Sequence, residues 1–254
     1  MNTSLKVSII MPTFNIASLV SETINSVLSQ TYTNWELLII DDYSSDGTPL
    51  ILKEFEQSES RIKVVYSKKN YGAGVSRNIG LEIAQGRFIA FLDSDDIWQK
   101  DKLSKQVAHM LLNNAAISHT SFSFIGEDGE QRAGYVKASE SVDLLHHLKF
   151  TEIGTSTAII DTQLVKEKFS FSEIRARQDL KLWIELLSLG YISKGLNLPL
   201  VKYRVRAESV SSNKIKMILI TFDIYMKLRI LPLKVRLICY FSYINNALAK
   251  RKNK

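Results

Sequence analysis

The chain has 254 residues, of which 45% are hydrophobic and 23% charged, and its net charge at pH 7 is +7. This composition is typical of a soluble globular protein with a substantial core, and no stretch approaches the roughly 18 apolar residues of a transmembrane helix. The single cysteine, Cys239, excludes a disulfide framework and favours a reducing compartment. One cysteine and four scattered histidines also exclude a zinc site, because no ligand spacing is present.

The positive charge is concentrated at the C-terminal end. From Lys214 onward there are ten Lys or Arg residues and one acid, Asp223, so this tail carries +9 and residues 1–213 carry −2. Such asymmetry predicts an anionic partner, either a membrane surface or a nucleic acid. No nucleic-acid-binding module is recognisable, so we expect a membrane surface and no nucleic acid.

Short apolar runs alternate with amphipathic segments along the first half of the chain. Pro12 is expected to stop the first strand, and Ser18 is expected to cap the first helix. The alternation predicts βαβ units, and hence an α/β fold with a mostly parallel central sheet covered on both faces. Strands are predicted at 7–11, 36–40, 62–66 and 88–92, and helices at about 18–30, 49–57, 75–84 and 102–112.

The second half is less regular and ends in the basic tail. Pro232 is expected to divide the tail into two helices, whose spaced lysines leave a broad apolar face suited to an anionic membrane interface. The alternative is a helix pair that packs on the domain. Strands are predicted at 117–125, 156–160 and 199–205, helices at 144–148 and 178–189, and a turn at 127–130.

Polar and acidic residues follow several predicted strands at the edge where ligands bind to parallel sheets. The fourth strand runs into three carboxylates, Asp93, Asp95 and Asp96, which repel each other unless a cation neutralises them. Oxygen ligands of this kind suit Mg²⁺ or Mn²⁺ bound together with phosphate. A solvated acidic turn before the next helix is the alternative. No glycine-rich dinucleotide or P-loop motif is present.

Four blocks in residues 7–113 resemble the family 2 inverting glycosyltransferases, in the order that this family has. They read V-S-I-I-M-P-T-F-N, S-V-L-S-Q-T-Y-T-N-W-E-L-L-I-I-D-D-Y-S-S-D-G-T, N-Y-G-A-G-V-S-R-N-I-G and G-R-F-I-A-F-L-D-S-D-D-I-W. Further on, Q-D-L-K-L-W at 178–183 and Y-R at 203–204 are similar to the family's acceptor-side patterns. The resemblance implies a GT-A nucleotide-binding sandwich at 1–213, with a nucleotide-sugar half (1–113), an acceptor half (114–213) and the tail at 214–254.

The resemblance also implies site residues. Asp95 would bind the metal, and Asp179 would be the general base, although Asp at a helix start is common for electrostatic reasons alone. Residues implied to bind the nucleotide are Pro12, Phe14, Asp41, Asp42, Arg77 and Asp93. Residues with less defined roles are Asp96, Trp183, Arg204 and Arg206. Phe14 and Arg77 have structural alternatives, loop packing and pairing with a local acid. The sequence departs from the family pattern at Gln178, where Glu is usual, and at Arg206, where many members have His.

The activity implied is transfer of a hexose with inversion, from a nucleotide sugar, UDP-linked, to a lipid-linked or growing glycan. Bacterial enzymes of surface polysaccharide, O-antigen and lipopolysaccharide synthesis have this organisation. We therefore expect a divalent metal cofactor, Mn²⁺ or Mg²⁺, and a cytoplasmic enzyme, peripheral on the inner membrane. The alternatives are a sugar nucleotidyltransferase and a non-catalytic member of a glycan assembly complex.

Overall fold

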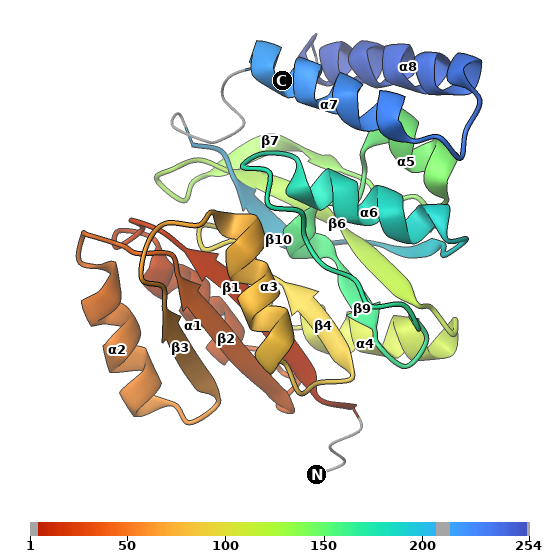
Figure 1. The fold of residues 1–254 in the computed structure, drawn as a ribbon. Helices are drawn as coiled ribbons and strands as arrows, with labels where there is room; N and C mark the ends of the chain where they lie inside the picture. The colour runs from red at the N-terminus through yellow and green to blue at the C-terminus, as the bar shows by residue number, and fades with distance from the viewer. Residues whose placement is uncertain (1–4, 207–213, 253–254) are drawn as a thin grey trace.

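The computed structural model describes residues 5–206 and 214–252 (Figure 1). The strands are β1 (Val7–Thr13), β2 (Trp35–Asp41), β3 (Ile62–Tyr66), β4 (Phe88–Phe91), β5 (Ile97–Trp98), β6 (Ile117–Ile125), β7 (Gln131–Val136), β8 (Ser141–Val142), β9 (Ile159–Asp161) and β10 (Ser193–Arg204). The α-helices are α1 (Val20–Leu28), α2 (Thr48–Ser58), α3 (Ala73–Ile83), α4 (Lys102–Leu112), α5 (Leu144–Phe150), α6 (Gln178–Ser188), α7 (Lys214–Lys227) and α8 (Leu233–Lys252).

All ten strands of the described residues form one sheet, in the order β3-β2-β1-β4-β9-β6-β10-β5, with β7 on β6 and β8 on β10. β1 pairs in parallel with β2 and β4, β2 with β3, and β6 with β10. β9 lies antiparallel between β4 and β6, so these two also point the same way. The mostly parallel sheet is therefore confirmed, and its main strands end at one edge.

Pro12 does not stop the first strand, contrary to the prediction. β1 continues to Thr13, and Pro12 lies opposite Ile40 of β2. The carbonyl of Ile10 points toward β4, where it accepts the N–H of Leu92. Pro12 has the same orientation two residues later, after β4 has ended. The N–H that proline lacks would have had no strand partner there, so the ring is tolerated.

Helices cover both faces of the sheet. Apolar residues of α1, α2 and α4 share one buried cluster with one side of β1, β2 and β4, whereas α3 and α6 pack on the other side. In Figure 1, α3 lies across β1 and β2. This close approach depends on Gly80, where an added Cβ would lie 2.5 Å from Cγ2 of Ile10.

Several predicted boundaries are wrong. The first helix begins at Val20 after Leu19, so Ser18 is not its cap. The strand predicted at 156–160 is a 3₁₀ turn at Thr155–Thr157 followed by β9. The Thr157 side chain explains this difference, because its hydroxyl donates to the carbonyl of Gly154 at 2.6 Å and competes with strand pairing. The last strand begins earlier than predicted, at Ser193, and the short strands β5, β7 and β8 were not predicted.

The basic tail forms two helices on either side of Pro232, as predicted. The helices lie side by side over α5 and α6 (Figure 1). Their inner faces bury Tyr225, Tyr240 and Tyr243 against Leu180 and Ile184 of α6. Packing on the domain, the alternative at the sequence level, therefore occurs. The predicted boundary at residue 213 lies outside the described residues. Within the part of the chain that is described, none of the helices combines the length and apolarity needed to span a bilayer.

Candidate active site

Two carboxylates at the end of β2 fix the loops around the expected nucleotide site. Asp41 is buried and accepts hydrogen bonds from the hydroxyls of Thr13 (3.2 Å) and Ser44 (2.6 Å). Asp42 accepts the backbone N–H groups of Tyr71 (2.8 Å) and Gly72 (2.7 Å). These acids tie the ends of β1 and β2 to the start of α3. The loops at this part of the carboxyl edge of the sheet are therefore held in place by hydrogen bonds.

Arg77 of α3 pairs with Asp93 at the end of β4. Its Nη2 lies 2.5 Å from Oδ1 of Asp93, and its guanidinium lies 5.1 Å from the ring centroid of Phe171. Arg77 is buried, and its Nε and Nη1 have no hydrogen-bond partner within the described residues. Pairing with a local acid, an alternative at the sequence level, therefore occurs. Two donors remain unpaired, and they suit an added acceptor.

Asp95 and Asp96 follow in the turn after β4. Burial, together with the charge of Asp93, raises the pKa of Asp95, and Nη1 of Arg206 at 3.5 Å from its Oδ2 partly offsets this. Burial and the charges of Asp95 and Asp93 raise the pKa of Asp96 well above its usual range. The carboxylates are therefore crowded and electrostatically unfavourable, as the sequence predicted. A cation at this site would lower the free energy of their ionised forms.

Arg204, at the end of β10, holds the acidic turn in place. Its guanidinium donates to the carbonyl oxygens of Asp95, Gly126 and Glu127, at 2.8 to 3.1 Å, and pairs with Glu22 of α1 at 2.5 Å. Its backbone N–H donates to Oδ1 of Asp96 at 3.0 Å. Nε, Nη1 and Nη2 of Arg204 are thus all paired with described protein groups, and these bonds fix the acidic turn. Arg206, by contrast, faces the Asp95 carboxylate directly.

Asp179 lies in the first turn of α6, in the part of the chain predicted to form the acceptor half. Its Oδ2 accepts a hydrogen bond from the hydroxyl of Thr155 at 3.3 Å. The next residue, Ser156, accepts the backbone N–H of Asp93 at 3.0 Å with its hydroxyl oxygen. One dipeptide therefore contacts both the backbone of Asp93, at the start of the acidic turn, and the carboxylate of Asp179. The two halves of the site meet here.

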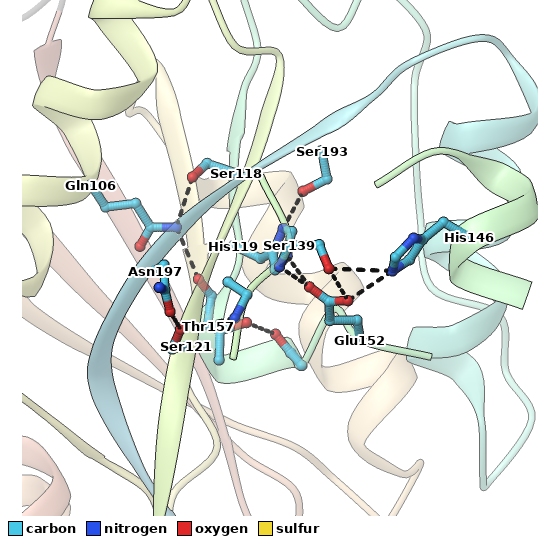
Figure 2. A network of polar contacts seen from close by, with 12 residues as sticks. Gln106, Ser118, His119, Ser121, Ser139, His146, Glu152, Thr157, Ser193 and Asn197 are labelled. Atoms are coloured by element: carbon cyan, nitrogen blue, oxygen red, sulfur yellow. Dashed lines mark hydrogen bonds and ion pairs between the residues drawn. The ribbon is translucent and has the colours of Figure 1, made fainter. Parts of the chain in front are cut away.

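A buried polar network surrounds Glu152, which precedes this dipeptide in the chain (Figure 2). Glu152 bridges Nε2 of His119 (3.1 Å) and Nε2 of His146 (2.9 Å), and it also accepts from Ser139. Nδ1 of His119 bonds Ser193 of β10 at 2.8 Å. Glu152 precedes Thr155 by three residues, so the network fixes the start of the segment that reaches Asp179 and Asp93.

The other predicted residues occupy different settings. Phe14 is 49% exposed beside the loop that follows β2, so the structure does not bury it as a packing residue. Trp183 is fully buried in the core, with its ring centroid 6.2 Å from that of Phe91, and it does not line the carboxyl edge of the sheet. Sequence reasoning missed Thr155, Ser156 and Glu22. The only signal for the first two is the small polar run at 154–157 before an apolar strand.

The donor set fits a hard divalent cation. The described residues contain no cluster of three or more His, Cys, Asp or Glu side chains placed to bind a metal. Magnesium and manganese with a nucleotide need fewer protein ligands, because one or two carboxylates and the phosphates supply the oxygens. Asp95 has a raised pKa beside Asp93, and it provides this chemistry. Carboxylate oxygens suited to Mg²⁺ or Mn²⁺ are therefore present at this edge, and the phosphates of a nucleotide would supply the other ligands.

Comparisons with known proteins identify the family of the chain. The profile of glycosyl transferase family 2 matches residues 8–165. The putative teichuronic acid biosynthesis glycosyltransferase TuaG of Bacillus subtilis is 41% identical over 245 residues, which cover 96% of this chain and 97% of TuaG. WfgD of Escherichia coli, a UDP-Glc:alpha-D-GlcNAc-diphosphoundecaprenol beta-1,3-glucosyltransferase, is 42% identical over 212 residues, 83% of this chain and 81% of WfgD.

Solved structures support the fold. S. aureus TarS 1-349 in complex with UDP-GlcNAc superposes with a TM-score of 0.74 at 20% sequence identity, over 96% of this chain and 73% of that chain. The mannosyltransferase PcManGT of Pyrobaculum calidifontis, in complex with GDP-Man and Mn²⁺, gives a TM-score of 0.68 at 17% identity, over 96% and 73%. The predicted GT-A architecture is confirmed. From the profile match and the relatives above 40% identity over most of its length, the chain belongs to glycosyl transferase family 2 and is a glycosyltransferase.

Proposed function

We propose that this enzyme transfers a hexose with inversion, from a UDP-sugar to a hydroxyl group of a lipid-diphosphate-linked glycan, in bacterial surface polysaccharide synthesis. The observation that carries the proposal is the dipeptide Thr155-Ser156. It contacts the Asp93 backbone on one side and the Asp179 carboxylate on the other, at 3.0 and 3.3 Å. A donor diphosphate beside Asp93 and Asp95 would thus place its sugar near a base. The substrate class follows the names of the relatives, WfgD in particular.

The residues divide the chemistry between them. Asp41 and Asp42 hold the loops that frame the nucleotide, with Pro12 and Phe14 beside them, and Arg77 orients Asp93. Asp95 would hold Mn²⁺ or Mg²⁺, and Asp93 beside it would contact the ribose side of the nucleotide. The cation would offset the negative charge of the leaving diphosphate. Arg206, next to Asp95, presents its guanidinium to the same region.

Asp179 acts on the acceptor. It removes the proton from the attacking hydroxyl group as the oxygen bonds to the anomeric carbon. The bond between that carbon and the phosphate oxygen breaks on the opposite face, and its electron pair leaves with the nucleoside diphosphate. The proton remains on Asp179, and the configuration of the sugar is inverted.

A product assay tests the proposal. The full chain is incubated with Mn²⁺ or Mg²⁺, an N-acetylglucosaminyl-diphospho-lipid, and UDP-glucose, UDP-N-acetylglucosamine or GDP-mannose in turn. We expect acceptor-dependent release of UDP and a lengthened lipid-linked glycan. In a parallel incubation with UTP and glucose 1-phosphate, release of pyrophosphate would instead indicate a nucleotidyltransferase. An unchanged donor in every combination would favour a non-catalytic role.

We also propose that the tail hairpin, α7 and α8, binds the cytoplasmic surface of an anionic membrane, which is where a lipid-linked acceptor lies. Its inner face is buried on the domain, but its outer surface exposes apolar side chains, Leu219, Phe222, Ile238 and Phe241, that are 41 to 63% accessible. Basic residues also lie exposed on these helices and in the turn between them, namely Lys216, Lys227 and Lys234 on the helices and Arg229 in the turn. Exposed apolar and basic side chains together suit an anionic lipid surface.

Sedimentation with vesicles tests this surface. The full chain should sediment with phosphatidylglycerol vesicles, less so with neutral vesicles, and less at high salt, because each basic residue contributes about 1 kcal/mol that salt screens. The double variant Phe222→Ser, Phe241→Ser should lose binding. The matched control is Leu112→Ser on α4, which removes an 87% exposed apolar side chain elsewhere. Equal binding by the double variant and the control would argue against the membrane surface.

A further inference from the structure

The residue before α6 has an unfavourable backbone conformation. Arg177 is the N-cap of this helix, with φ 65° and ψ 17°, in the left-handed region that residues other than glycine seldom adopt. Its side chain makes no capping hydrogen bond to the helix. Such a conformation persists only where surrounding contacts hold it. Because Asp179 follows two residues later, the contacts of Arg177 bear on where that carboxylate lies.

The contact that holds Arg177 comes from the tail. Its Nη2 donates to the Tyr243 hydroxyl oxygen at 2.6 Å, and its guanidinium lies 5.6 Å from the ring centroid of the same tyrosine. Nε of Arg177 is buried and has no hydrogen-bond partner among the residues that the structure describes. Tyr243 lies on α8 and is 6% exposed. Tyr243 of the tail therefore holds Arg177, the N-cap residue of the helix that carries Asp179.

The tail is itself fixed to the body, so it can serve as a rigid support. The Tyr225 hydroxyl donates to the carbonyl of Leu148 at 2.6 Å, and the Asn246 amide donates to the carbonyl of Lys149 at 3.1 Å. Both carbonyls belong to α5. The first turns of α6 meet the tail through Leu180 and Ile184, in one cluster with Tyr243. Among the described residues, the side chain of Asp179 has only the long bond from Thr155, so its position depends on the backbone of α6.

We propose that Tyr243 is a positioning residue for the transfer reaction. Its hydroxyl and ring hold Arg177 in the left-handed conformation, and Arg177 in turn sets the direction in which the first turn of α6 presents Asp179 to the acceptor. The inference rests on the proposed role of Asp179 as the base. It gives the tail a function in catalysis that is separate from membrane binding.

The test compares tyrosine variants of the full chain with UDP-glucose and the N-acetylglucosaminyl-diphospho-lipid. Tyr243→Phe removes the acceptor of the Arg177 bond and keeps the ring. The matched control is Tyr240→Phe on the same helix, whose hydroxyl donates to the carbonyl of Ile218 at 3.2 Å and does not contact Arg177. We expect kcat of Tyr243→Phe to fall roughly 10-fold, because small displacements of a reacting group are costly, with KM for the donor unchanged. The control should stay within about twofold of the wild type, since it leaves Arg177 and α6 in place.

A double-variant cycle separates positioning from general destabilisation. Arg177→Met should lower kcat to a similar extent, and the double variant Arg177→Met, Tyr243→Phe should lose no more than either single variant, because both remove one interaction. Additive losses, or a kcat for Tyr243→Phe equal to that of Tyr240→Phe, would overturn the inference. If Asp179→Asn kept full kcat, the base assignment itself would fail, and this inference with it. A large loss in Asp179→Asn and none in Tyr243→Phe would reject the positioning role alone.

Discussion

Replacing Glu152 by glutamine tests whether the network behind the site depends on an ionised carboxylate. Burial would raise the pKa of Glu152, but hydrogen bonds with His119, the Ser139 N–H, His146 and the Ser139 hydroxyl outweigh it and hold the pKa at about 2, against 4.5 ordinarily. Figure 2 shows the carboxylate at the centre of these contacts. Glu152→Gln keeps the size of the side chain and removes its charge.

The expected magnitude follows from the pKa shift. A carboxyl group whose pKa is lowered on folding stabilises the protein fully above the unfolded pKa of 4.5, and this stabilisation is lost as the pH falls through about 2. A shift of that size is worth about 3 kcal/mol at pH 7 and about 1 kcal/mol at pH 3. We therefore expect Glu152→Gln to lower the free energy of unfolding by up to these amounts at the two pH values.

Urea unfolding of the wild type and Glu152→Gln at pH 7 and pH 3 measures this difference. The matched control is Glu185→Gln, which removes an exposed pair with Lys181 at 3.7 Å and should cost less than about 1 kcal/mol at pH 7. A Glu152→Gln deficit that is equal at both pH values would refute the reasoning, since it would arise from packing and not from the charge. Transfer should also slow in this variant, because Glu152 anchors the segment of Thr155.

Three further substitutions give distinct outcomes. Asp95→Asn should abolish transfer and the Mn²⁺-dependent part of UDP binding, measured by calorimetry with and without metal. Asp179→Asn should lower kcat by roughly 10²–10⁴-fold and leave UDP affinity unchanged, because a base acts on the acceptor proton only in the transition state; a loss of UDP affinity would place Asp179 in the nucleotide site. Gly80→Ala should lower the free energy of unfolding by about 1–3 kcal/mol in urea titrations, because its Cβ would lie 2.5 Å from Ile10; an unchanged midpoint would mean that α3 moves away easily.

The elements that the sequence predicted well are those whose local pattern and tertiary role agree. Ile62–Tyr66, Lys102–Leu112 and Ile117–Ile125 form β3, α4 and β6 with the predicted bounds. The two strands begin and end on β-branched or aromatic residues, and the helix repeats its apolar residues at helical spacing. The strand β7 was missed because its residues are mostly exposed and show no apolar alternation, although the turn predicted at 127–130 lies between β6 and β7. β5 has two residues, too few for any period.

Some features of the site could also be predicted from the sequence, and others could not. The carboxylates at the ends of β2 and β4 could be predicted because strand ends in parallel sheets meet at one edge. Arg204 and Glu22 could not be paired from the sequence, because 182 residues separate them and neither lies in a periodic pattern that points to the other. The tail was ambiguous for a different reason. Its helices carry apolar residues on a face that packs on α5 and α6 and on a face that remains exposed, so the sequence alone suited both membrane binding and packing on the domain.

The unpaired polar atoms at the site connect its stability to its use. Arg77 is buried with Nε and Nη1 unpartnered, and Asp96 is buried with Oδ2 unpartnered, as far as the described residues go. Each such atom costs about 1–3 kcal/mol of desolvation that no protein contact offsets. The fold tolerates this because the pairs with Asp93 and the Arg204 backbone hold the same side chains rigidly. A nucleotide sugar that pairs with these atoms would bind to side chains that are already ordered. Little of its binding free energy would then be lost in ordering them.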